Sequence, residues 1–146
     1  NPHVISCKIH DIPNSLGLYI SELATGKYEN CEIYKTGKSG IIAKDNANPH
    51  VIGCKIHDIP EHFGVHLRDK SSGIYENCKI YKTMTGFNVS HASPIIYGCE
   101  IFEIKAYGIR LDKAKGRYEN CYIYKTEFSK IDGASLFTKI INCGKY

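Results

Sequence analysis

The chain has 146 residues, 42% of them hydrophobic, and a formal net charge of +4. This length is typical of one domain, and the apolar content is sufficient for a core. No run of about 18 apolar residues occurs, which excludes a membrane-spanning helix. The charge is mild, so we expect neither a nucleic acid partner nor a membrane partner.

Two short sequences alternate along the chain. The first, NPHVISCKIHDIP at residues 1–13, returns as NPHVIGCKIHDIP at residues 48–60. The second, YENCEIYKT at residues 28–36, returns as YENCKIYKT at 75–83 and as YENCYIYKT at 118–126. Self-similarity of this kind indicates a repeat architecture.

The cysteines give the period of the repeat. Seven of them follow one another at intervals of 21 to 24 residues: Cys7, Cys31, Cys54, Cys78, Cys99, Cys121 and Cys143. Structural zinc sites instead place two cysteines only two to four residues apart, so this spacing argues against zinc. We interpret each interval as one structural unit.

Each unit contains three short segments with the alternation of half-buried strands. The first segment precedes the cysteine and points one residue inward: Val4, Tyr28, Val51, Tyr75, Ile96, Tyr118 or Ile140. Asn, Gly or Ser then predicts a bend, and an inward Cys is followed two residues later by Ile in all but the last unit. The third segment opens with glycine, at Gly17, Gly40, Gly64, Gly86, Gly108 and Gly133.

Three short strands per unit, with no helix between them, predict an all-β parallel β-helix. The sequence provides six coils of about 23 residues and the start of a seventh, so residues 1–146 form a single domain. Neighbouring coils would lie about 4.8 Å apart, which stacks equivalent residues into ladders. Residue 1 is Asn rather than Met, so we expect this domain to be part of a larger protein.

The segments NPHVIGCKIHDI, GVHL and GIYENCKIY carry a family resemblance. The whole chain resembles the right-handed parallel β-helix repeats of the pectin-lyase-like superfamily, more narrowly those of the carbohydrate-binding and sugar-hydrolase type. The resemblance implies a right-handed solenoid. It says little about activity, because similar repeats occur in proteins of many kinds.

Charges alternate four residues after each cysteine. The series is Asp11, Lys35, Asp58, Lys82, Glu103 and Lys125. Stacked coils would place opposite charges next to each other, provided that the strand has already bent at these positions. We therefore interpret the two alternating sequences as charge compensation that also fixes the register.

Aromatic side chains occupy the position three residues after the cysteine. They are His10, Tyr34, His57, Tyr81, Phe102 and Tyr124. These residues alternate with the inward Ile and are predicted to form an outward ladder. Such a ladder can stabilise the sheet, or its rings can bind sugars or partner side chains, and the sequence leaves both interpretations open.

The glycine-opened strands present the least repetitive outward positions. One row contains Tyr19, Ile42, His66, Asn88, Arg110 and Ser135, and the next contains Ser21, Lys44, Arg68, Ser90, Asp112 and Phe137. Lys44, His66, Arg68, Arg110 and Asp112 are the candidates for a second binding surface, here called the second-strand patch. A solvated face is the alternative.

No catalytic or metal-binding residue and no cofactor is predicted. Asp11 and Asp58 would lie about 9.6 Å apart, near the upper limit for an inverting carboxylate pair. The intervening Lys35 would lower their pKa values, whereas a general acid requires a raised one. His3 and His50 follow Asn-Pro turns and are not placed to share a metal.

We therefore expect a non-catalytic module that binds a protein or carbohydrate partner. The alternatives are a polysaccharide lyase or hydrolase, and a structural protein that associates end to end through its open coils. Inward cysteines stacked in register point the same way and favour reduced thiols. Unpaired thiols suit an intracellular location without establishing one.

Overall fold

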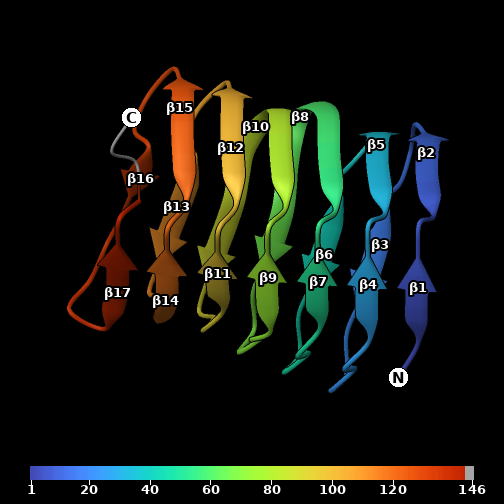
Figure 1. Ribbon diagram of the computed structural model, residues 1–146, viewed down its shortest axis with the longest axis horizontal. Coiled ribbons are helices and arrows are strands. Elements are labelled where there is room, and N and C mark those ends of the chain that lie inside the picture. The colour runs from blue at the N-terminus through green and yellow to red at the C-terminus, as the bar shows by residue number, and fades with distance from the viewer. Residues whose placement is uncertain (144–146) are drawn as a thin grey trace.

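In a computed structural model, residues 1–143 form a solenoid of parallel strands, the all-β parallel β-helix that the sequence predicts. The coils follow one another along the long axis, with the N-terminal coil at one end and the C-terminal coil at the other (Figure 1). No helix able to cross a membrane occurs in this part of the chain.

One sheet contains the strands that precede the cysteines. Its order is β1 (His3–Ile5), β4 (Lys27–Glu29), β7 (His50–Ile52), β9 (Ile74–Glu76), β11 (Ile95–Tyr97), β14 (Gly116–Glu119) and β17 (Thr138–Ile141). Every neighbouring pair is parallel and in register, so Val4 is aligned with Tyr28 and Tyr28 with Val51. We call this the seven-stranded sheet.

The other sheet contains ten strands from the remaining two segments of each coil. Its main path consists of β2 (Lys8–Ile12), β5 (Glu32–Thr36), β8 (Lys55–Leu67), β10 (Lys79–Ser90), β12 (Glu100–Ile104) and β15 (Tyr122–Thr126). Alongside lie β3 (Leu18–Ile20), β6 (Ile41–Ala43), β13 (Ile109–Asp112) and β16 (Ile131–Asp132). In coils three and four the two predicted strands merge into the long strands β8 and β10, with an irregularity between Thr83 and Thr85.

Left-handed residues bend the chain three times in each of the first five coils, and two of these bends were predicted from the sequence. The residue before each cysteine has a positive φ, as in Asn30 at 52° and Gly53 at 60°, which is why Asn and Gly recur there. The alternating charged column is also left-handed, with φ of 55° at Asp11 and 52° at Lys35. The strand has therefore turned at these positions, as the charge-ladder interpretation requires.

The core is a set of stacked ladders. Val51, Tyr75, Ile96 and Tyr118 are almost fully buried in the seven-stranded sheet. Opposite them lie the inward isoleucines Ile33, Ile56, Ile80, Ile101 and Ile123, together with five buried cysteines. The ladder opens at both ends, since Cys7 is exposed and Cys143 is half-buried.

The glycine column results from close approach between coils. A Cβ on Gly86 would lie 2.5 Å from the Gly108 carbonyl oxygen and 2.6 Å from Ile101 Cγ2. The prediction that Gly133 is the sixth member of this column was wrong. Strand β13 pairs with β16 so that Ile109 is aligned with Ile131, and the Ile109 amide donates to the Lys130 carbonyl. The sixth position of the column is therefore Lys130.

Candidate functional site: three outward surfaces

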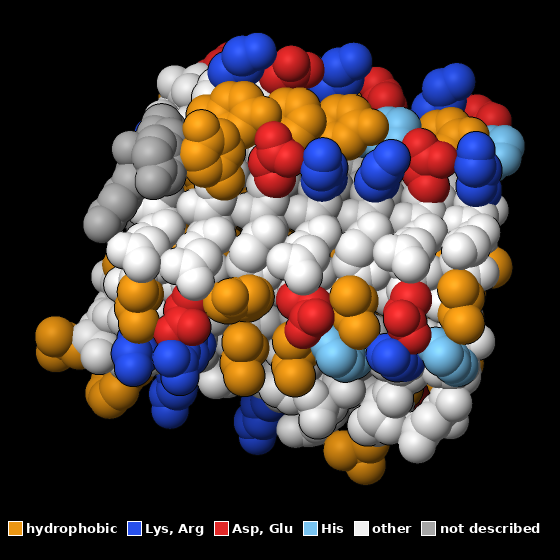
Figure 2. All heavy atoms as spheres, in the orientation of Figure 1, with side chains coloured by type: hydrophobic (Ala, Val, Ile, Leu, Met, Phe, Trp, Pro, Cys, Tyr) orange, Lys and Arg blue, Asp and Glu red, His pale blue; other side chains and the backbone are white. Residues whose placement is uncertain are grey.

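The six aromatic residues form one continuous stack on the outer side of the ten-stranded sheet. Ring centroids are 4.8 Å apart from His10 to Tyr34, 5.0 Å to His57, 4.6 Å to Tyr81, 4.9 Å to Phe102 and 5.2 Å to Tyr124. Interplanar angles do not exceed 9°. Figure 2 shows this row over β2 to β15, with charged side chains on both sides. We call it the aromatic ladder.

His57 is the most constrained member of the aromatic ladder. Its Nδ1 lies 2.5 Å from Asp58 Oδ2, and its Nε2 lies 3.0 Å from Glu32 Oε1. A carboxylate only accepts, so both ring nitrogens must carry a proton to make both bonds. The His57 bond, followed by attraction to Lys8, holds the pKa of the Glu32 carboxyl below its ordinary value.

The stacking determines what the aromatic ladder can offer to a ligand. The face of each internal ring is covered by its neighbours, so the ring edges and their polar atoms are what point outward. Some of these atoms are engaged: the Tyr124 hydroxyl donates to Glu100 Oε1 at 2.8 Å, and this bond raises the pKa of Tyr124 to about 12. Within the aromatic ladder, ring faces not covered by another ring of the stack therefore occur only at its two ends, and at one end Tyr122 packs against Tyr124 at 5.1 Å.

The charged column beside the aromatic ladder is paired at some of its steps. Lys35 Nζ lies 4.0 Å from Asp11 Oδ1, and Lys125 Nζ lies 3.6 Å from Glu103 Oε1. Asp11 also accepts from His10 Nδ1 at 2.6 Å, a bond that, with Lys35, lowers the pKa of its carboxyl. A lowered pKa keeps Asp11 ionised, which is unsuited to a general acid.

The second-strand patch is divided between two rows and several coils. Lys44 pairs with Asp45 at 3.0 Å and lies over the Tyr19 ring, and contacts with Tyr19 and Asp45 raise its pKa. His66 packs edge-on against Phe63 at 5.0 Å, and burial lowers its pKa.

The other three residues of this patch lie close to polar neighbours. Arg68 Nε lies 3.7 Å from Asp69, Arg110 Nε lies 4.0 Å from Asp132, and Asp112 accepts from the Ser90 hydroxyl at 3.3 Å. Because Asp132 is aligned with Arg110, the predicted place of Ser135 in this row was wrong, and the place of Phe137 in the next row shifts with it. The five residues do not converge on a single site.

The outer face of the seven-stranded sheet has exposed apolar residues that the repeat pattern alone does not indicate. Ile95 is 42% exposed and Tyr97 is 44% exposed on the same face of β11. Ile74 of β9 pairs directly with Ile95, and Ile52 of the next strand, β7, is a diagonal neighbour of Ile74. We call Ile52, Ile74, Ile95 and Tyr97 the apolar patch. Its signal in the sequence is the pair of large apolar residues flanking the inward Ile96.

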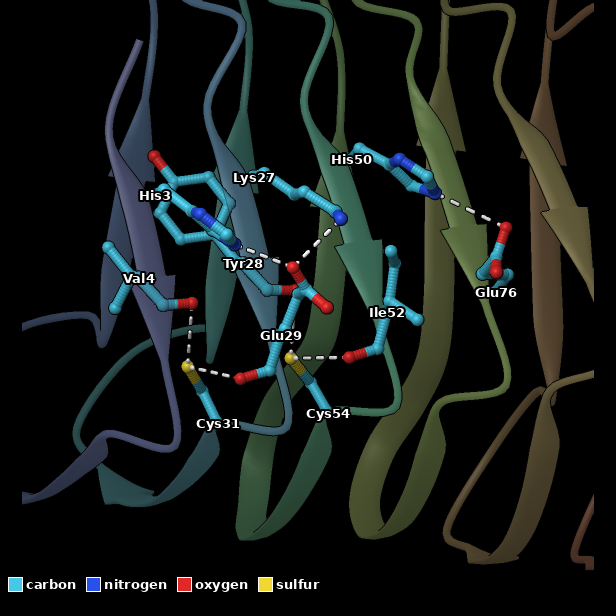
Figure 3. Close-up of polar contacts among 10 residues, drawn as sticks. All are labelled: His3, Val4, Lys27, Tyr28, Glu29, Cys31, His50, Ile52, Cys54 and Glu76. Carbon is cyan, nitrogen blue, oxygen red and sulfur yellow. Dashed lines mark hydrogen bonds and ion pairs between the residues drawn. The ribbon is translucent and has the colours of Figure 1, made fainter.

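Ion pairs flank the apolar patch on the same face. His3 Nε2 and Lys27 Nζ both reach Glu29 Oε1, at 2.5 and 2.8 Å, and His50 Nε2 reaches Glu76 Oε2 at 3.2 Å (Figure 3). On the other side Arg117 pairs with Glu119. The bonds from Lys27 and His3 lower the pKa of Glu29. Apolar and acidic side chains alternate along this face, as the lower rows of Figure 2 show. Ile74 and Ile95 are direct neighbours, whereas Glu76 lies between Ile52 and Tyr97.

The cysteine thiols lie beneath this face and point into the core. Cys54 Sγ donates to the carbonyl oxygens of Tyr28 and Ile52, both at 3.5 Å (Figure 3). Side-chain hydrogen bonding with Cys78, and burial, raise the pKa of Cys54, so this thiol remains protonated and unreactive. All seven cysteines are free. Among residues 1–143 no cluster of three or more His, Cys, Asp or Glu residues is arranged to hold a metal ion.

Comparison with known proteins identifies the family. A model of the right handed beta helix region matches residues 1–143. Neither a curated protein nor a solved structure matches this chain. The chain belongs to the right-handed β-helix family, as the resemblance of its repeats predicts.

Proposed function

We propose that this β-helix is a non-catalytic binding module and that its partner is a protein docked on the outer face of the seven-stranded sheet. The apolar patch is the centre of the proposed surface. The remaining coils act as a scaffold that holds this face straight, because every strand of the sheet is paired in register with its neighbours.

The observation that supports this proposal is the exposure of large apolar side chains at adjacent positions. Ile95 and Tyr97 retain 42% and 44% of their accessible surface, although both project from a fully paired strand. Ile74, Ile95 and Tyr97 are neighbours on this face, and Glu76 with its partner His50 lies at their edge. Exposed apolar side chains beside polar ones are typical of protein interaction sites. Tyrosine is also among the residues that contribute most to binding energy at such sites.

The flanking ion pairs support a protein partner with mixed charge. Glu29 and Glu119 lie on opposite sides of the apolar patch, each beside a basic residue of its own strand, Lys27 or Arg117. Lys27 and Arg117 are about half exposed in these pairs. Ion pairs at a protein surface contribute little to stability, so these cations can exchange partners at low cost. Such peripheral charges contribute more to specificity and association rate than to affinity.

Two other functions have less support. A carbohydrate on the aromatic ladder would find most ring faces already covered by neighbouring rings. A polysaccharide-cleaving enzyme would need a carboxylic acid with a raised pKa, whereas the pKa values of Asp11, Glu29 and Glu32 are lowered by their hydrogen bonds.

Tyr97→Asp tests the proposal, with Tyr19→Asp as the matched control. Both tyrosines are exposed to a similar degree, 44% and 50%, but on different sheets. The unmodified β-helix is used to capture a protein from an extract of the source cells. That protein is identified and purified, and its affinity for each variant is measured by titration. We expect Tyr97→Asp to weaken its binding at least about tenfold, the cost of a lost central contact, and Tyr19→Asp to leave it unchanged. Equal affinities for both variants would contradict the proposal.

A further inference from the structure

The turn that follows the glycine-opened strand changes length in the middle of the molecule. In coils two and three it contains two successive left-handed residues, Asp45 and Asn46, then Asp69 and Lys70. In the next two coils it contains one, His91 and then Lys113. The Lys70 amide donates to the His91 carbonyl, and the His91 amide donates to the Asp112 carbonyl. The shorter turn is therefore stacked directly under the longer one and leaves a step.

A groove of about 310 Å³ lies at this step. Its lining consists of Lys70, His91, Ala92, Ser93, Lys113 and Lys115. Every polar side chain in this set can donate a hydrogen bond, and no carboxylate is among them. On the other side of Lys70 and His91, a neighbouring hollow includes Asp45 and Asp69. Asp45 and Asp69 therefore lie outside the groove, and Asp112 reaches it only through Ser90 and His91.

The lysines of the groove have no carboxylate partner, although Lys115 Nζ lies over the Phe137 ring, 5.5 Å from its centroid. Within residues 1–143, no carboxylate oxygen lies within 4.0 Å of the ammonium group of Lys70, Lys113 or Lys115, whereas Lys8, Lys27 and Lys44 are all paired. Three like charges around one hollow repel each other, and an anion placed between them would relieve this repulsion.

His91 is held in a defined orientation beside them. Its Nδ1 lies 3.0 Å from the Ser90 hydroxyl, which in turn lies 3.3 Å from Asp112 Oδ2. Ser90 has a single proton and the carboxylate only accepts. Ser90 therefore donates to Asp112 and accepts from His91 Nδ1–H. His91 Nε2 has no partner within the described residues, and it donates to an anion when the ring carries both protons.

We infer that this groove binds a small organic phosphate or sulfate, with Lys70, Lys113 and Lys115 around the anionic group and His91 and Ser93 as additional polar contacts. A volume near 300 Å³ is at the lower end for small-molecule sites and exceeds what one inorganic anion fills. The site lies on the turns that lead into the seven-stranded sheet, with Ser93 two residues before Ile95. It shares no residue with the apolar patch and does not depend on the function proposed for that patch.

Glucose 6-phosphate, inorganic phosphate and glucose are suitable probes. Binding of each probe is measured at low ionic strength from amide chemical shifts and by titration calorimetry. We expect glucose 6-phosphate to shift the amides of the groove, inorganic phosphate to shift the same amides more weakly, and glucose to shift none. Lys113→Gln should weaken binding about tenfold, since a charge-assisted hydrogen bond is lost.

Two variants separate a built site from general attraction. Lys38→Gln removes one exposed, unpaired charge elsewhere and should change affinity less than about twofold. Insertion of a glycine between His91 and Ala92 lengthens the turn to two residues and should abolish binding without removing a charge. If that insertion disrupts folding, Lys70→Gln replaces it, with the same tenfold expectation as Lys113→Gln. Absence of groove shifts at about 10 mM glucose 6-phosphate, or equal weakening by Lys38→Gln and Lys113→Gln, would overturn the inference.

Discussion

Lys130 occupies in the sixth coil the position that Gly108 occupies in the fifth. A Cβ on Gly108 would lie 2.5 Å from Ile123 Cγ2 and 2.6 Å from the Lys130 carbonyl oxygen. Lys130 bears such a Cβ, and within residues 1–143 no further strand pairs with β16. If another coil were added there in the same register, its inward isoleucine would clash with the Cβ of Lys130. End-to-end association, one of the alternatives raised by the sequence, therefore requires a different register or a local shift.

Gly86→Ala should destabilise the fold, because its new methyl group would lie within 2.6 Å of Gly108 and Ile101. Overpacking of this kind costs about 1–3 kcal/mol. Lys130→Ala, in the same column, adds no Cβ and should cost about 1 kcal/mol or less. Urea unfolding of both variants measures the difference. Equal midpoints would show that the coils are not stacked as closely as described.

The sequence predicts the coil because its period, its left-handed Asn and Gly positions and its inward Ile residues all report short-range geometry. It misplaces the sixth glycine because Gly133 lies ten residues after Ile123, whereas the glycines of other coils follow their Ile by six to eight. Lys130, seven residues after Ile123, has the right spacing but not the expected residue type. Spacing is the better guide at such a position.

The candidate surfaces are less predictable than the coil. Alternation alone places the aromatic ladder outward, and the stacking of His57 between Tyr34 and Tyr81 confirms it. Alternation does not show how exposed Ile95 and Tyr97 remain, since that depends on what covers the seven-stranded sheet. The groove at the turns cannot be predicted from the sequence either. A turn that is one residue shorter creates a groove only when it is stacked against the longer turn of the neighbouring coil.

The thiols should react in three classes. Cys7 is exposed, Cys143 is half-buried, and the remaining five cysteines are buried. In native protein we expect one fast reaction with Ellman's reagent, one slower reaction and five protected groups, because thiol reactivity follows exposure. In denaturant all seven should react. A smaller total in unreduced protein would reveal disulfides and contradict the free-thiol ladder.

Alkaline pH should unfold the protein cooperatively. Burial raises the pKa values of Tyr28, Tyr75 and Tyr118, and the bond to Glu100 raises the pKa of Tyr124 to about 12. A raised pKa in the folded state contributes stability that is present below pH about 10 and is lost as pH rises further.

Absorbance at 295 nm during a pH titration should therefore show the exposed tyrosines ionising first. The buried ones should follow in a steeper step that coincides with the loss of the far-ultraviolet circular dichroism signal. A single ordinary titration of all 11 tyrosines while the fold persists would contradict the burial of the inward tyrosines.

His57→Phe should raise the pKa of Glu32 toward its ordinary value of 4.5, since the His57 bond is the main cause of its depression. Phenylalanine preserves the stacked ring and removes both donors. A depressed carboxyl pKa adds stability above the ordinary pKa that disappears as pH falls through the folded value, so this variant should lose less stability in acid. Carbon-13 NMR of the Glu32 carboxyl measures the change.

His10→Phe is the control for that measurement. It should raise the pKa of Asp11, whose first cause of depression is the His10 bond, and leave Glu32 unaffected. If His57→Phe leaves Glu32 unchanged, the His57–Glu32 bond is absent in solution.

The most direct test of the binding-module proposal is photo-crosslinking from two positions. Benzoylphenylalanine replaces Tyr97 in one protein and Tyr19 in the other, which places the probe on the seven-stranded sheet or on the ten-stranded sheet. We expect irradiation in an extract of the source cells to give a discrete protein adduct from position 97 and none from position 19. Adducts from position 19 alone, or from neither position, would contradict a protein partner on the apolar patch.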